Sequence, residues 1–354
     1  MALLEVKEYD RKIYENELKN FLPEKMIDIH THIWLERLFR KAKEMAAENR
    51  TVTWPSLVAR ENSVEELEET YRLMFPGKEV TPLMFATARD KEMSELNRYV
   101  KEKAKETGYP ALYFSRPEES ADELECAIRD GGFLGIKSYL SLSAGYLPTK
   151  EIRIFDFFPK HQLEKMNEMK AIVMLHIPRD GRLKDPVNLA QIKEIAREFP
   201  NVKLIVAHIG RAYVPDDIGN AFEELAECKD IYFDFSANCC EYAMTRLLEM
   251  VEPKRILFGS DLPILRMKTR RIEENGTYIN LVPPGIYNGA AKDPHLREVS
   301  AEEAETITFF MYEEILAFKR AAQKAGLTAA DVEDVFYRNA KNLLDNARRD
   351  IYGG

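Results

Sequence analysis

Short apolar runs recur along this chain, and longer stretches with helical spacing of apolar residues stand between them. Runs of about four to eight apolar residues bounded by turn residues are typical of buried strands. The later runs are continuously apolar, which indicates strands that are covered on both faces. The eight runs occupy residues 26–30, 82–87, 111–115, 133–140, 171–177, 202–209, 231–236 and 255–260.

Helix signals appear between the apolar runs. Residues 91–108 end at a glycine, residues 119–132 begin with a serine cap, and residues 185–200 have proline in the first turn. These are usual start and stop signals of helices. Repeated strand–helix alternation predicts an α/β protein, closed as a single (β/α)8 TIM-like barrel. A doubly wound open sheet is the alternative.

Three long segments interrupt this alternation and are predicted to be loops after strands 1, 4 and 8. They cover roughly residues 33–60, 141–156 and 262–300. In a barrel, the loops that follow the strands lie at the end where active sites are built. The last segment shows no helix or strand periodicity, and its length favours a functional cap over a plain connection.

Two extra helices, at roughly 301–324 and 328–346, are predicted to close a single domain of residues 1–354, with its barrel core at about 26–346. Hydrophobic residues make up 45% of the chain, which suits a large soluble core. The formal net charge of -9 argues against nucleic-acid binding. The sequence shows no secretory signal and no apolar run of membrane-spanning length, so a cytoplasmic location is expected.

Four of the six histidines stand at predicted strand ends. His30 and His32 end the first strand, His176 ends the fifth and His208 the sixth, while Asp261 follows the eighth. Residues i and i+2 of an extended segment point to the same face, so His30 and His32 can converge on one ion. Three histidines and one carboxylate suit zinc and leave a position for water. The pattern therefore predicts a metal site.

Several short motifs carry a family resemblance. They are residues 28–32 (DIHTH), 175–176 (LH), 206–210 (VAHIG), 258–263 (FGSDLP) and 338–344 (RNAKNLL). Together they resemble the amidohydrolase superfamily, and more narrowly its amidohydrolase-2 branch. The resemblance covers nearly the whole chain and implies a metal-dependent barrel enzyme. The branch includes non-oxidative decarboxylases and lactonases that act on small organic acids.

The resemblance also implies roles for the strand-end residues. His30, His32 and His176 resemble the metal ligands of the family, and Asp261 resembles the residue that approaches the metal and takes a proton from its water. His208 resembles the histidine that hydrogen-bonds this water or the substrate oxygen. A bound zinc ion lowers the pKa of its water to near ~7. One divalent ion, zinc, is the expected cofactor.

Basic residues follow several of the predicted strands. Lys137 stands within the fourth run rather than at its end, which favours a contact with a barrel carboxylate or a substrate anion over a role in bridging two metal ions. The planar fork of an arginine binds both oxygens of a carboxylate. A small anionic substrate is therefore expected, and the proposed contacts are Arg89, Lys137, Arg179, Arg211 and Arg266. His161 and His295 are assigned no role.

The leading hypothesis is hydrolysis of an ester, lactone or amide bond in a small anionic organic or sugar acid. Non-oxidative decarboxylation of a similar acid uses the same ligands and stays open. Two further alternatives are a metal-free hydrolase and a catalytically silent barrel that only binds a metabolite. The sequence leaves open the substrate, the identity and number of the metal ions, and whether the chain forms a homo-oligomer.

Overall fold

The computed structural model describes residues 3–39, 54–87, 93–287 and 293–353. All eight predicted strands are present, and they run parallel in two sheets. The smaller sheet pairs β1 (Lys25–His32) with β2 (Glu79–Phe85). The larger sheet consists, in order, of β3 (Tyr113–Phe114), β4 (Gly135–Lys137), β5 (Ile172–Leu175), β6 (Lys203–Val206), β7 (Ile231–Asp234) and β8 (Ile256–Leu257).

The two sheets are bonded to each other at both edges of the larger one. A parallel bridge between Met84 and Ala111 connects β2 to the residues before β3. A second parallel bridge, between Thr31 and Leu262, connects β1 to the residues after β8. The carboxyl ends of all eight strands therefore point to the same side of the molecule.

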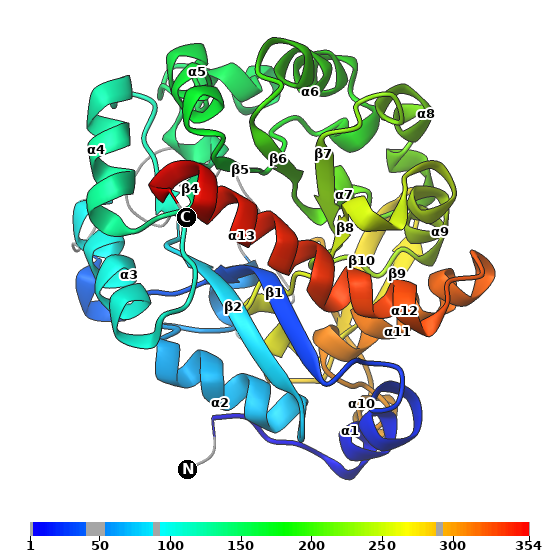
Figure 1. Cartoon of the computed structure of the whole chain (residues 1–354). Helices are drawn as coiled ribbons and strands as arrows, with labels where there is room; N and C mark the ends of the chain where they lie inside the picture. The colour runs from blue at the N-terminus through cyan, green and yellow to red at the C-terminus, as the bar shows by residue number, and fades with distance from the viewer. Residues whose placement is uncertain (1–2, 40–53, 88–92, 288–292, 354) are drawn as a thin grey trace.

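Helices surround the strands, as Figure 1 shows. Ser63, Ser120 and Asp185 cap three of them by accepting hydrogen bonds from backbone amides of the first turn. The three helices with clear sequence signals are confirmed as α3 (Ser94–Thr107), α4 (Ala121–Gly131) and α6 (Pro186–Glu198). The surrounding helices are α2 (Val64–Met74), α3 (Ser94–Thr107), α4 (Ala121–Gly131), α5 (Lys160–Met169), α6 (Pro186–Glu198), α8 (Ala221–Leu225) and α9 (Glu241–Met250).

The segment 262–300, expected to lack regular structure, contains three strands. Asn275 and Gly276 have φ values of 53° and 75°, which builds the two-residue turn of an antiparallel hairpin. The Asn–Gly pair was a hairpin signal that the periodicity argument overlooked. The three strands are β9 (Arg270–Glu274), β10 (Thr277–Val282) and β11 (Leu296–Glu298).

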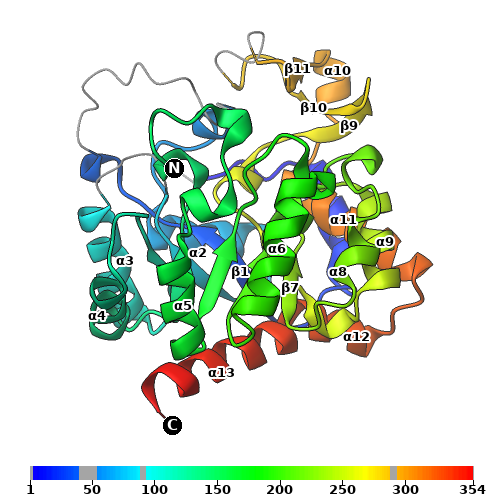
Figure 2. The ribbon, with the colours of Figure 1, turned by 90° about the horizontal axis from the view of Figure 1, so that it is seen from above.

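Helices α12 (Ala329–Glu333) and α13 (Asn339–Tyr352) lie at the opposite end of the molecule from the three-stranded insert, whereas α10 (Ala301–Ala304) lies beside the insert, as Figure 2 shows. Helix α13 covers the amino ends of the strands, where Leu343 and Leu344 pack with Ile27 and Leu83 in a buried cluster. The helices after the insert are α10 (Ala301–Ala304), α11 (Phe310–Lys324), α12 (Ala329–Glu333) and α13 (Asn339–Tyr352).

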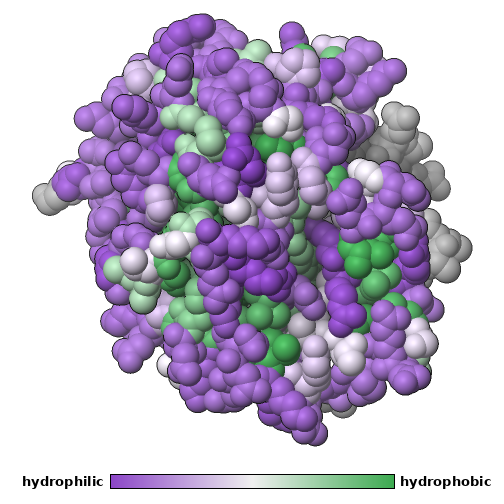
Figure 3. Space-filling view, turned by 90° about the vertical axis from the view of Figure 1, so that its right-hand side faces the viewer, coloured by the Kyte–Doolittle hydropathy of each residue, from purple (hydrophilic) through white to green (hydrophobic). Residues whose placement is uncertain are grey.

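Polar residues dominate the side of the molecule drawn in Figure 3, and apolar residues show in smaller patches between them. Within the described parts of the chain, no helix has both the length and the apolar character that crossing a membrane requires.

Helix α11 buries an acid that pairs with no cation of the described residues. Glu314 is fully buried and forms no ion pair with the described residues, while the backbone of Ala237 and Asn238 lies close enough to its carboxyl group to oppose the effect of burial on its pKa. Burial raises the pKa of Glu314 well above its usual value. The folded state therefore holds this proton to a higher pH than the unfolded chain does. As a result, the free energy of unfolding falls as the pH rises above the usual pKa of a glutamate.

Glu314→Gln keeps the shape of the side chain and cannot ionise. We expect its stability advantage over the wild type to grow by about 1.4 kcal/mol for each pH unit between the two pKa values of Glu314. Urea unfolding at about pH 5 and about pH 8 measures this difference, with the exposed Glu302→Gln as a control. The same stability difference at both pH values would contradict a protonated, buried Glu314.

Candidate active site

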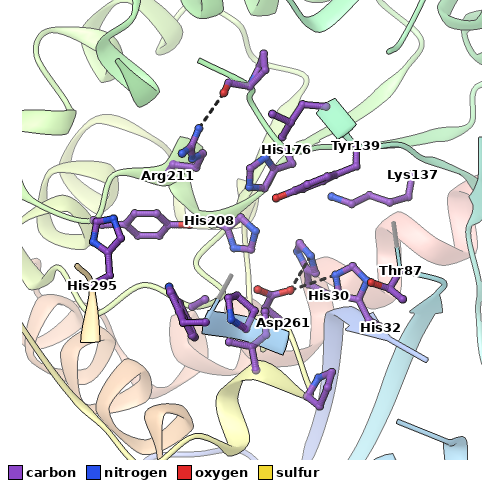
Figure 4. Close-up of a pocket in the computed structure, with 18 of the residues that line it drawn as sticks. His30, His32, Thr87, Lys137, Tyr139, His176, His208, Arg211, Asp261 and His295 are labelled. Atoms are coloured by element: carbon purple, nitrogen blue, oxygen red, sulfur yellow. Dashed lines mark hydrogen bonds and ion pairs between the residues drawn. The ribbon is translucent and has the colours of Figure 1, made fainter. Parts of the chain in front are cut away.

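A cavity of about 580 Å³ opens at the carboxyl ends of the parallel strands. Every residue predicted as a metal ligand or catalytic group lines it, as Figure 4 shows. Each stands at or just beyond the end of β1, β5, β6 or β8, so the sequence placed them correctly at one end of the fold. These residues are His30, His32, His176, His208 and Asp261.

Asp261 lies between the two histidines of β1. Its Oδ1 atom is 3.2 Å from Nε2 of His32 and 3.5 Å from Nε2 of His30. The ligand atoms of these three residues all lie within 4.8 Å of one another, and the same holds for His30, His208 and Asp234. Two overlapping groups with metal-ligand chemistry therefore meet at His30.

Hydrogen bonds at the far side of each ring fix the tautomers of His32 and His208. Nδ1 of His32 lies 2.8 Å from the carbonyl oxygen of Ala86, and Nδ1 of His208 lies 2.9 Å from that of Ser236. A carbonyl only accepts, so each Nδ1 carries the proton. The lone pair of each ring is consequently on Nε2.

Asp234 fixes His30 in the same way. Its Oδ2 lies 3.0 Å from Nδ1 of His30, and its Oδ1 accepts from the backbone amides of His208 and Ser236. Carboxylates that hold the outer nitrogen of a histidine orient it for metal binding. Asp234 is fully buried and is a residue that the sequence analysis missed. The signal was present, because a single carboxylate interrupts the apolar strand IYFDFS.

These contacts direct nitrogen lone pairs toward a carboxylate, an arrangement that a cation bound between them would stabilise. Burial lowers the pKa of His30, and it lowers the pKa of His208 to about 4, so neither ring supplies a positive charge by protonation at neutral pH. A divalent ion bound by the Nε2 atoms and by Asp261 satisfies every one of these groups. The donor set therefore fits a metal.

His176 lies at the edge of this cluster. Its ring centroid is 4.7 Å from that of Tyr139 and 5.3 Å from that of His208. Its Nδ1 is buried and has no hydrogen-bond partner within the described ranges. His176 is absent from both groups of closely spaced ligand atoms, so its role as a ligand stays a prediction.

A turn of left-handed backbone presents His208 and Arg211 to the cavity. All four residues of α7 (His208–Arg211) have φ between 51° and 61°. Non-glycine residues in this region cost about 1–2 kcal/mol each. Gly210 relieves part of the cost, and a Cβ there would lie 2.5 Å from a side-chain carbon of Leu183. Strain of this kind is typical of functional sites.

Two of the five predicted substrate contacts line the cavity, namely Lys137 and Arg211. Lys137 is the last residue of β4, which corrects the expectation that it stands within a longer strand. A short 3-10 helix, Leu140–Leu142, follows the strand after two residues. Burial lowers the pKa of Lys137 to about 8, although the charges of Asp234 and Asp261 oppose this effect.

Two further predicted contacts, Arg266 and Arg179, are not brought to the cavity by the structure. Arg266 corrects the prediction most clearly, because its buried guanidinium donates through Nε to Thr70 and lies among the side chains of α2. Arg179 pairs with Asp185 at 3.1 Å and is absent from the cavity lining. Arg89 lies outside the described residues.

The insert supplies cavity residues that are not among the predicted substrate contacts. Arg271 of β9, Tyr278 of β10 and His295 line the cavity. His295 stacks on Tyr278 at 4.3 Å between ring centroids, and its Nδ1 lies 3.0 Å from the carbonyl oxygen of Tyr278. His295 was assigned no role because its segment was expected to be irregular.

Parallel strands with histidines and an aspartate clustered at their carboxyl ends define an α/β protein of the amidohydrolase type. Residues 27–345 match the family model described as Amidohydrolase, and the chain belongs to this family. The resemblance of the sequence motifs is thereby confirmed. No curated protein matches the chain.

Three solved structures share the fold at low identity. An amidohydrolase II from a structural-genomics programme is 16% identical with a TM-score of 0.56, covering 90% of this chain and 99% of that one. A 2,6-dihydroxybenzoate decarboxylase from Rhizobium is 13% identical (TM-score 0.51, coverage 92% and 99%). A dihydroxybenzoic acid decarboxylase from Polaromonas sp. JS666, with bound manganese and 2-nitroresorcinol, is 16% identical (TM-score 0.52, coverage 93% and 100%).

Proposed function

We propose that this chain is a metal-dependent hydrolase that opens an ester, lactone or amide bond in a small anionic substrate. The position of Asp261 carries the proposal, because its carboxylate faces the lone-pair nitrogens of His30 and His32 inside the cavity. A carboxylate in that position can both hold an ion and take a proton. We also infer that the two bonded sheets act as one closed barrel.

One divalent ion would be held by His30, His32 and Asp261, with His176 as the fourth ligand. Zinc is proposed because imidazole and carboxylate ligands suit it. When bound, such an ion polarises the scissile carbonyl and lowers the pKa of a coordinated water.

Side chains of the protein itself would accept the proton, orient the water and bind the substrate. Asp261 accepts the proton of the attacking water at a carboxylate oxygen. His208 is neutral with its proton on Nδ1, so its Nε2 accepts a hydrogen bond from that water and orients it. Lys137 lines the same cavity and donates to an oxygen of the substrate.

Non-oxidative decarboxylation is the second candidate. Lys137 favours it, because this fully buried cation lines the cavity, forms no ion pair among the described residues and suits a carboxylate of the substrate. Two dihydroxybenzoate decarboxylases also share the fold, at 13% and 16% identity.

Removing and restoring the metal tests the proposal. The chelated protein should lose its activity on a panel of lactones, esters and amides of small acids, and added zinc should restore it. Metal analysis of the purified chain should find about one divalent ion per chain. Full activity after complete metal removal would overturn the proposal. Release of CO₂ from aromatic acids, with no hydrolysis across the panel, would favour decarboxylation instead.

A further inference from the structure

Arg271 lines the cavity, and three aromatic rings lie around its guanidinium group. Its guanidinium carbon lies 4.3 Å from the ring centroid of Tyr278, 4.5 Å from that of Phe310 and 5.1 Å from that of Tyr213. It donates through Nε to Asn280 at 2.9 Å and through Nη1 to the carbonyl oxygen of Ala237 at 2.7 Å. None of the described residues forms an ion pair with it.

Arg211 also forms no ion pair with the described residues. Its Nη1 donates to three backbone carbonyl oxygens, at 3.1–3.4 Å, and no acid of the described chain pairs with it. Its neighbours differ, because Arg179 pairs with Asp185 and Arg182 pairs with Asp217. Two cavity arginines therefore keep an uncompensated charge in a chain whose formal net charge is -9.

Arg211 and Arg271 both line the cavity. They do so together with Tyr213, whose ring centroid lies 5.1 Å from the guanidinium carbon of Arg271 and which follows Arg211 by two residues in the chain. Figure 4 shows Arg211 and His295 on one side of the cavity and His30, His32 and Lys137 on the other. We call the side of the cavity with His30, His32 and Lys137 the histidine end, and the side with Arg211 the arginine end.

We propose that the substrate carries a carboxylate remote from its reacting carbon, and that Arg211 and Arg271 bind this carboxylate at the arginine end of the cavity. Guanidinium groups bind carboxylates through paired hydrogen bonds, and such bonds are strong where water is excluded. The backbone and ring contacts already hold both side chains in place, which limits the entropy lost on binding. The inference rests on the proposed function, because it places the reacting group at the histidine end.

Binding of simple acids to the metal-loaded chain tests the inference without requiring turnover. Benzoate has one carboxylate, whereas benzene-1,3-dicarboxylate and benzene-1,4-dicarboxylate have two that are separated by a rigid ring. In calorimetric titrations we expect at least one dicarboxylate to bind about 10- to 100-fold more tightly than benzoate. Equal affinities, or no detectable binding of either dicarboxylate, would overturn the inference.

Variants locate the second carboxylate. Arg271→Gln should remove most of the preference for the dicarboxylate, and Arg271→Lys should restore part of it through charge alone. Arg182→Gln is the matched control, because Arg182 lies against the same two tyrosines but is already neutralised by Asp217. An equal effect of Arg271→Gln and Arg182→Gln would refute the assignment. A retained preference without any turnover would leave this binding site standing while the proposed reaction failed.

Discussion

Asp261→Asn is expected to lower the turnover number by about 10³- to 10⁴-fold, near the upper limit for loss of a general base. The amide has the shape of the carboxylate but neither takes up a proton nor carries the charge that faces His30 and His32. The fold should persist, since the backbone amide of residue 261 keeps its 2.8 Å bond to the carbonyl oxygen of His30. Steady-state kinetics and a thermal unfolding curve measure the two effects separately.

Asp216→Asn is a suitable control for this substitution. Asp216 is exposed and pairs with Lys184 at the surface, so its change should leave turnover close to that of the wild type. Turnover of Asp261→Asn within a few-fold of the wild type, with the metal retained, would remove Asp261 from the proton-transfer step. Asp261→Glu, which keeps the charge but moves it, should recover only part of the rate.

The strands and the histidine site could be predicted from sequence because buried strands appear in it as continuously apolar runs. Parallel strands covered on both faces are continuously apolar, so a histidine or aspartate at the end of such a run is conspicuous. His176 and Asp261 stood out for this reason, and both line the cavity. Asp234 carried the same mark inside its strand, yet its support of His30 depends on a contact between residues 204 positions apart.

The substrate side of the cavity could not be predicted in the same way. Residues 266–271 carry several basic groups, and their composition does not say which of them faces the cavity. Successive residues of a strand point to opposite faces. Arg270 accordingly bonds outward to Thr306, while Arg271 turns to the cavity. Arg266 precedes the strand and is turned into the core, where α2 supplies partners that are distant in sequence.

His208→Ala is expected to lower turnover by about 10²- to 10⁴-fold while most of the metal is retained. The ring is buried, with its centroid 4.8 Å from that of His30, and its Nε2 lone pair is available to the attacking water. His30, His32 and Asp261 remain as ligands in this variant, so the metal content should fall far less than the rate. Kinetics and elemental analysis of the same preparation make the comparison.

His161→Ala provides the matched control for this prediction. His161 lies on α5 at the surface, where its Nε2 contacts the carbonyl oxygen of Glu119, and its loss should change neither rate nor metal content. If His208→Ala loses its metal in parallel with its activity, His208 is a ligand rather than a group that orients water. That outcome would favour two metal ions, with His208 and Lys137, at the end of β4, as candidates for holding the second.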